Sequence, residues 1–304
     1  MGFRLCAARP GPRRPGRSGD HQRLPERWPC GPPPLPVEKG AKMGSTAQGT
    51  LQNPLLKVPV ITLYFWTSKL VITAMGEATS DFLVAHANPY LAVTGCGILF
   101  AVSLLLQIRK THYHPVYYWF AVIMVSIFGT QIADVAHVVV GIPYRFTTAT
   151  FLVALAAIIA AWKFSEKTLA IHSVHSTRRE LFYWAAIVAT FSLGTAAGDM
   201  TASSLGLGYF SSGLLFAALF AVAILAYLMM DTWEVASFWT AYILTRPLGA
   251  SVADWLDKPT LSGGLGIGTS AVSGILATSV ILILVFLRIS RVDDPNRRTS
   301  RTPG

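Results

Sequence analysis

Charged side chains are scarce in this chain. Only 13% of its 304 residues are Asp, Glu, Lys or Arg, whereas about a quarter is usual in soluble domains. The mean hydropathy is +0.48. These values exclude an ordinary cytosolic enzyme and a disordered protein. Cysteine is also rare, because Cys6, Cys30 and Cys96 are the only three, and their spacing fits neither a disulfide framework nor a metal site.

Much of the positive charge lies at the N-terminus. The net charge is +10, and residues 1–42 hold nine Lys or Arg against three Asp or Glu, which gives +6. The remaining +4 forms no basic patch with interleaved aromatics, so nucleic acid is not a predicted partner. Residues 1–55 are predicted to be a disordered basic tail. The first 42 are either a cytoplasmic arm or, as we favour, a stretch upstream of a true start at Met43.

Long apolar runs dominate the remainder of the chain. Each is about 20 residues long, enough to cross a hydrocarbon core of roughly 30 Å, and short loops with Pro, Gly, Asn or charges separate them. The sequence therefore predicts an all-α, multi-pass membrane protein with eight transmembrane helices. The runs cover residues 60–84, 89–108, 116–140, 146–164, 182–205, 209–230, 236–256 and 267–288.

Basic residues gather in the loops on one side of the predicted spans. The positive-inside rule makes that side cytoplasmic, so both termini are predicted to be cytoplasmic and the odd-numbered spans run outward. The opposite side carries only Arg145 and Lys258. The cytoplasmic loops carry Arg109, Lys110, Lys163, Lys167, Arg178 and Arg179, and the C-terminal end adds Arg288 and Arg291.

One motif, Trp-x9-Gly-x4-Asp, occurs four times, once in each odd-numbered span. The four copies are Trp66/Gly76/Asp81, Trp119/Gly129/Asp134, Trp184/Gly194/Asp199 and Trp239/Gly249/Asp254. Repetition at this period indicates tandem structural units, here two helices each and all in the same orientation. The predicted units are residues 56–110, 111–170, 171–231 and 232–288, followed by a cytoplasmic tail over 289–304.

The motif segments resemble a known family. They are Tyr64-Phe65-Trp66, Gly129-Thr130-Gln131-Ile132-Ala133-Asp134, Gly194-Thr195-Ala196-Ala197-Gly198-Asp199 and Thr245-Arg246-Pro247-Leu248-Gly249-Ala250. Over residues 56–288 the chain is similar to a bacterial membrane-protein family with four tandem copies of a two-helix repeat of unknown function, each with a characteristic Trp. The resemblance implies a protein of the bacterial inner membrane, and it supplies no substrate and no catalytic residues.

Each motif position suggests a role. At about 1.5 Å per residue, the tryptophans Trp66, Trp119, Trp184 and Trp239 fall near the cytoplasmic interface, which predicts interfacial anchors. The glycines Gly76, Gly129, Gly194 and Gly249 fall near mid-membrane. Each is followed four residues later by a small residue, and this spacing predicts close helix packing.

The acidic position is the candidate site. Asp81, Asp134, Asp199 and Asp254 share one depth in the outer part of the membrane, and counting back one turn places Glu77, Thr130 and Thr195 behind three of them. If the odd helices surround a common axis, these groups form a ring of hard oxygen ligands for a cation. Arg246 and Lys69 are the predicted charge partners, with Lys69 facing Glu77. The alternative, which we favour less, is that the acids serve the fold alone.

Two functions remain open from the sequence. The favoured one is a secondary transporter of a small cation (a divalent metal, sodium or a proton-coupled ion) that binds at the ring of aspartates. The alternative is a membrane scaffold, sensor or partner subunit in which the motif is purely structural. Motifs that pair a nucleophile with a base do not occur, so neither an enzyme nor a cofactor is predicted, and the expected partners are the lipid bilayer and a small cation.

Overall fold

The computed structural model describes residues 56–295, and every regular element in that range is helical. The predicted tail over residues 1–55 and residues 296–304 lie outside it. Three short 3-10 turns occur in the loops, at Ile171–Ser173, Asp231–Trp233 and Thr260–Ser262. The long helices are α1 (Leu63–His86), α2 (Pro89–Ile108), α3 (Pro115–Asp134), α4 (Tyr144–Glu166), α5 (Thr177–Asp199), α6 (Tyr209–Met229), α7 (Glu234–Asp257) and α8 (Thr269–Ser290).

Local sequence explains several helix starts. The hydroxyl of Thr62 accepts a bond from the Phe65 N–H at the start of α1, and Ser176 caps α5 in the same way. Asn88 caps α2, whose first position is Pro89. Such caps satisfy N–H groups that have no partner inside the helix. Helices α3 and α5 each continue into a π-helical turn directly after their motif aspartate, at Val135–Val139 and Met200–Ser204.

Six of the long helices are long and apolar enough to cross a membrane, namely α2, α3, α4, α5, α6 and α8. Helices α1 and α7 are not among them. Both carry charged side chains in their interior, such as Glu77 in α1 and Arg246 in α7, which lowers their hydropathy. The structure thus supports a membrane protein with several spans. Six of the eight predicted spans have the length and hydropathy that crossing a membrane requires.

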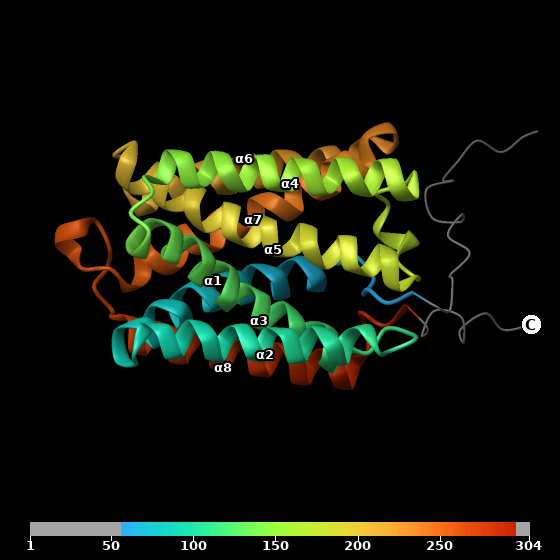
Figure 1. Ribbon diagram of the computed structural model, residues 1–304, viewed down its shortest axis with the longest axis horizontal. Coiled ribbons are helices and arrows are strands. Elements are labelled where there is room, and N and C mark those ends of the chain that lie inside the picture. Colours follow the sequence, from blue (N-terminus) through green and yellow to red (C-terminus); the bar gives the residue numbers. More distant parts are fainter. Residues whose placement is uncertain (1–55, 296–304) are drawn as a thin grey trace, which may run out of the picture. The chain divides into compact units, whose positions relative to one another are not determined.

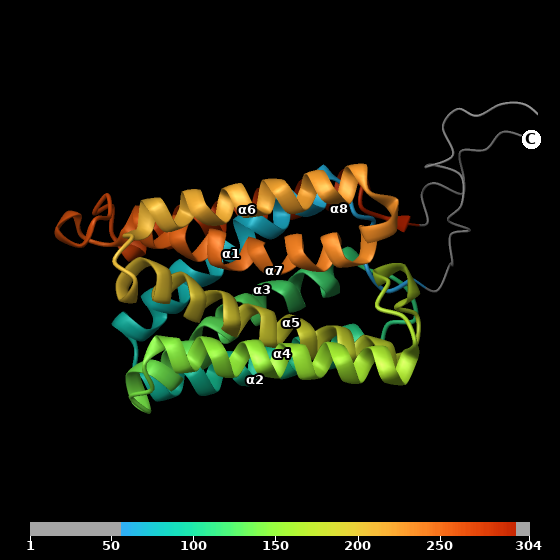
Figure 2. The same ribbon diagram turned by 90° about the horizontal axis from the view of Figure 1, so that it is seen from above.

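The four odd-numbered helices form a closed inner ring in which α1 packs on α3, α3 on α5, α5 on α7 and α7 on α1. Each even-numbered helix lies outside this ring against the next odd helix: α2 on α3, α4 on α5, α6 on α7, and α8 on α1 (Figures 1 and 2). Burial of the helices agrees with this arrangement. In the most apolar 18-residue stretch of each helix, 72% of the residues of α5 are buried, compared with only 17–22% in α2, α4, α6 and α8. The inner helices therefore position any central site.

One end of the bundle is covered by two short segments from the limits of the described range. The Val60 N–H donates to the Asp293 carbonyl (3.1 Å), and the Tyr113 N–H donates to the Leu56 carbonyl (2.8 Å). Lys57 Nζ lies 2.6 Å from a carboxylate oxygen of Glu180, and both side chains are buried. This end is therefore closed by hydrogen bonds and a buried ion pair.

The segment after α8 departs from the sequence prediction of a solvated tail. Asp293 is fully buried, and its carboxylate accepts hydrogen bonds from the Tyr113 hydroxyl and from Trp119 Nε1 (3.1 Å for the indole). Burial raises the pKa of Tyr113 well above 10, and the negative charge of Asp293 adds to that rise. Both bonds go to Asp293 Oδ2, and Oδ1 is buried without a hydrogen-bond partner among the described residues. These contacts place Asp293 in the folded structure.

The motif tryptophans also lie differently from the prediction. Trp66, Trp119, Trp184 and Trp239 are only 1–8% exposed and pack in the protein core. Aromatic side chains of the neighbouring odd helices pack against them. For example, the ring centroids of Tyr118 and Trp184 are 5.8 Å apart. They are not anchors that face lipid headgroups. Together with Phe65 and Tyr242 they fill the ring of odd helices below the closed end.

Candidate functional site

The motif glycines set how closely the inner helices approach. A Cβ placed on each glycine would overlap a residue of the neighbouring odd helix. On Gly129 it would lie 2.6 Å from the Phe191 Cβ, and on Gly249 it would lie 2.8 Å from the Thr73 Cβ. Gly76 faces Ser126 and Gly194 faces Arg246 in the same way. The four glycines thus occupy the four crossings of the ring, which bring polar side chains within reach of one another.

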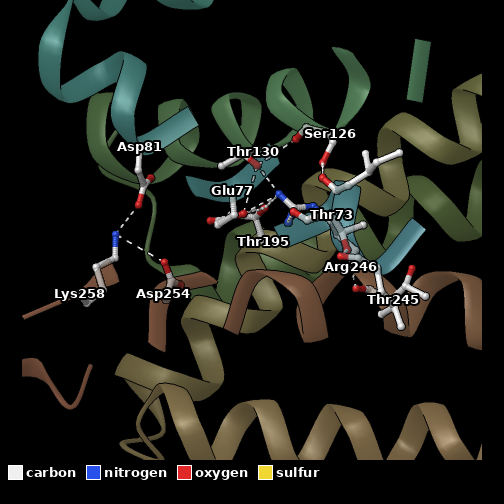
Figure 3. Close-up of polar contacts among 12 residues, drawn as sticks. Thr73, Glu77, Asp81, Ser126, Thr130, Thr195, Thr245, Arg246, Asp254 and Lys258 are labelled. Atoms are coloured by element: carbon white, nitrogen blue, oxygen red, sulfur yellow. Dashed lines mark hydrogen bonds and ion pairs between the residues drawn. The ribbon is translucent and has the colours of Figure 1, made fainter. Parts of the chain in front are cut away.

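A closed polar layer is formed by the residues that directly follow the motif glycines (Figure 3). Arg246 Nη2 of α7 is 2.6 Å from Glu77 Oε2 of α1. The hydroxyls of Thr130 on α3 and Thr195 on α5 each donate to the same carboxylate oxygen at 3.2 Å. Arg246 also contacts both threonines. All four side chains are at most 3% exposed, so every odd helix contributes to one buried network.

Arg246 reaches this layer from one turn away. Residue 250, which occupies the layer on α7, is a fully buried alanine, so space remains for the guanidinium. Its Nη1 also donates to the Thr73 carbonyl at 3.3 Å, and its Cζ lies 5.3 Å from the centroid of the Phe191 ring. A buried ion pair is stabilised by additional hydrogen bonds, and here two hydroxyls and a carbonyl supply them, while the buried Arg246 Nε has no hydrogen-bond partner among the described residues.

Lys69 does not take the role that the sequence predicts. Its Nζ lies 3.6 Å from the Tyr242 ring centroid and 4.8 Å from that of Phe191. It has no hydrogen-bond partner within residues 56–295. Among the cations of this range, only Arg246 forms an ion pair with Glu77. Arg246 reaches the layer of Glu77, whereas Lys69 lies two turns before Glu77 on α1. Lys69 instead makes cation–π contacts in the aromatic core.

A second cation, Lys258, lies at the end of α7 among three acids. Its Nζ contacts a carboxylate oxygen of Asp81 and lies 3.5 Å from Asp254 and 3.9 Å from Asp257. Burial opposes its charged form, but the negative charges of Asp254 and Asp81 raise the pKa of Lys258 above 10.5. Sequence reasoning missed Lys258 and Asp257 as site residues, although the four-residue spacing from Asp254 to Lys258 is a signal that could have found the lysine.

The acidic side chains converge in two overlapping groups. Carboxylate oxygens of Glu77, Asp199 and Asp254 lie within 4.8 Å of one another, and so do those of Asp81, Asp254 and Asp257. Asp254 belongs to both groups. Asp134 belongs to neither of these groups of described residues, and it lies half-buried where α3 turns into its π-helical segment. Asp254 thus meets Asp199 and Glu77 in one group and Asp81 and Asp257 in the other.

The two ends of the inner ring differ in access. Asp81, Asp134 and Asp199 are partly exposed at the end where the acids gather. At the opposite end the aromatic core and the buried pair of Lys57 and Glu180 fill the space. Clustered carboxylate oxygens suit hard cations such as Ca²⁺ or Na⁺, and these acids face only one end of the bundle.

A family model described as Repeat of Unknown Function (DUF347) matches three stretches of the chain, residues 117–168, 182–232 and 237–293. Together they cover more than half of the sequence, and each stretch carries all or most of one odd helix and the even helix that follows it. Neither a curated protein nor a solved structure matches the chain.

Proposed function

Because the chain belongs to the DUF347 repeat family, whose function is unknown, we propose a role from the geometry of its inner helices: secondary transport of a small cation. The single observation that carries this proposal is the convergence of Glu77, Asp81, Asp199, Asp254 and Asp257 at one end of the odd helices. On this proposal α1 and α7 also cross the membrane, which gives eight spans built from four parallel two-helix repeats. No enzymatic step is part of it.

Lys258 gives the proposed site a built-in competitor. Its ammonium group sits among Asp81, Asp254 and Asp257, where an incoming cation would find its carboxylate ligands. A cation that binds there must displace Lys258 or share the acids with it. Carboxylates this close cannot all carry charge cheaply without a counter-cation, so protons compete for the same oxygens and couple transport to pH.

One-sided access also favours a carrier. Of the proposed site acids, Asp81 and Asp199 are partly exposed at one end of the bundle and the others are buried, while the opposite end is closed by the aromatic core and the pair of Lys57 and Glu180. Alternating access requires that a central site face one side at a time while repeats rock against each other. On the predicted orientation, with both termini in the cytoplasm of a bacterial cell, the acids face outward.

A second candidate is a scaffold, sensor or partner subunit. It is favoured by the network around Glu77, whose charge Arg246 already compensates and whose hydrogen bonds join all four inner helices. On this alternative the acids and glycines hold the repeats together and bind nothing. The alternative predicts that removing an acid changes stability alone.

Cation-dependent thermal stability of the purified full chain tests the proposal, because a ligand that binds only the folded state raises the melting temperature. We expect one of Na⁺, Mg²⁺, Ca²⁺ or Mn²⁺ to raise it more at pH 7.5 than at pH 5.5. Asp254→Asn should abolish the shift. Lys258→Gln should lower the cation concentration that is needed at both pH values, since the raised pKa of Lys258 keeps it charged throughout this range.

Glu234→Gln is the control, because Glu234 is an exposed acid of the same helix at its other end. It should leave the cation shift unchanged. Cation flux into proteoliposomes that contain the wild-type chain or Asp254→Asn then tests transport itself. A chain that no cation stabilises, with Asp254→Asn merely less stable, would support the scaffold instead.

A further inference from the structure

An apolar groove runs along the outer surface of the bundle between α3 and α8. Val116 and Ile123 of α3 and Ile281 and Val285 of α8 contribute to its walls, and its volume is about 300 Å³. Val116, Ile281 and Val285 keep 45–61% of their surface exposed. Both helices are apolar enough to cross a membrane, so the groove faces the hydrocarbon of the bilayer.

A polar hollow of about 330 Å³ adjoins this groove at the end where the described termini lie. The hollow and the groove share Pro115 and Arg288, so one molecule can occupy both. The other residues that line the hollow are His112, Tyr113, His114, Arg291 and Asp294.

The hollow is predominantly positive. Arg288 and Arg291 are both exposed there, and Asp294 is its one acidic lining residue. The neighbouring Asp293 points inward to Tyr113 and Trp119. Burial lowers the pKa of His114 below 6.5, and Lys110, Arg288 and His112 lower it further. An anionic group would relieve this concentration of positive charge.

The backbone at the end of α8 adopts an unfavourable conformation at one of these cations, Arg291. Arg291 is the C-cap residue of α8 and has a φ of 51°, in the left-handed region that glycine usually occupies at helix ends. His114, across the hollow, gives α3 no side-chain cap, and the N-terminal dipole of that helix adds positive potential. Both helix ends therefore present positive charge beside an apolar groove.

We propose that the groove and the hollow together bind one anionic phospholipid, with its phosphate between Arg288 and Arg291 and an acyl chain along the groove. A zwitterionic lipid would fill the groove without using the cations, and inorganic phosphate would use the cations without the groove. Basic pockets at the membrane surface beside spanning helices are known to select anionic headgroups. The site lies at the opposite end of the bundle from the acids, so it does not depend on the transport proposal.

The test is a lipid titration of the full chain, delipidated in a neutral detergent and followed by its melting temperature. We expect phosphatidylglycerol to stabilise the chain at concentrations where phosphatidylcholine and inorganic phosphate do not. Arg288→Gln and Arg291→Gln should each weaken the apparent affinity by about fivefold. Arg109→Gln removes a cation at the same end but outside both cavities, and it should have no effect.

A second pair of variants tests the groove without any change in charge. Val285→Trp fills it, whereas Leu282→Trp adds the same ring to an exposed position of α8 that does not line it. Native mass spectrometry should show retained phosphatidylglycerol on the wild type and on Leu282→Trp, and much less on Val285→Trp. Equal stabilisation by both lipids, a full effect of phosphate alone, or equal retention by both tryptophan variants would each overturn the proposal.

Discussion

At the scale of single residues, Arg246 and Glu77 depend on each other. They come from the inner helices α7 and α1 and are almost fully shielded from solvent. Removing one partner of such a pair leaves an uncompensated charge, whereas removing both leaves neutral groups that the surrounding hydroxyls can still satisfy. The free energy of unfolding should therefore respond very differently to single and double replacement.

We expect Arg246→Gln alone to lower the free energy of unfolding by about 3–5 kcal/mol, because Glu77 keeps its charge. The double variant Glu77→Gln/Arg246→Gln should recover most of that loss. Denaturant-induced unfolding in mixed micelles measures both. Equal losses in the single and double variants would mean that the two charges do not interact.

The polar layer around Glu77 was predictable from the sequence only in part. The shared spacing of Glu77, Thr130 and Thr195 before the motif aspartates predicted that they lie at one depth, and in the structure they meet. Arg246 was expected to neutralise an acid, and it contacts Glu77. Lys69 is also a cation inside an odd helix, but it lies two turns from Glu77 on the same helix and packs over Tyr242 of α7. Which side chains of the other helices surround it cannot be read from spacing within one helix.

At the scale of helices, the motif glycines decide the spacing of the ring. Gly249→Ala should destabilise the fold by about 1–3 kcal/mol, because the added methyl overlaps Thr73 and the backbone of Ala74. Gly274→Ala is the control, since no atom lies within 4 Å of a Cβ at that position of α8. It should be neutral or slightly stabilising, as alanine favours helices. Similar losses in both variants would contradict a role for the glycine in packing.

The extent of each helix was largely predictable, whereas its neighbours were not. When the π-helical turns after α3 and α5 are included, the eight apolar runs match the eight long helices to within a few residues, except at the start of α5, because length and hydropathy are local properties. The sequence did not predict that α2 packs mainly on α3, or α8 on α1. The burial of the tryptophans was also missed, because an aromatic residue near a helix end fits a lipid interface and a protein core equally well.

At the scale of the whole molecule, the two limits of the described range meet at the closed end, through the bond between Val60 and Asp293. Because these two limits lie together and the inner ring is closed, the order of the two-helix units should be permutable. A chain that begins at Thr111, continues through α8 and is joined by a short Gly/Ser linker to residues 56–110 keeps every helix in its original direction. We expect this permutant to melt within about 5 °C of the wild type. Failure of a well-inserted permutant to fold would mean that the covalent connection between α2 and α3 is itself required.

The pairing of α1 with α7 has a consequence for biogenesis. Glu77 emerges from the ribosome 169 residues before its counter-charge on Arg246, which at typical synthesis rates is a delay of roughly 10–30 s. If α1 crosses the membrane as proposed, then during that interval this helix, with Lys69 and two acids, must either wait beside the translocon or enter the bilayer with its charges unmatched. Helix α8, synthesised last, then covers the outer face of α1. Among the described helices, α1 is thus made first and completes its contacts last.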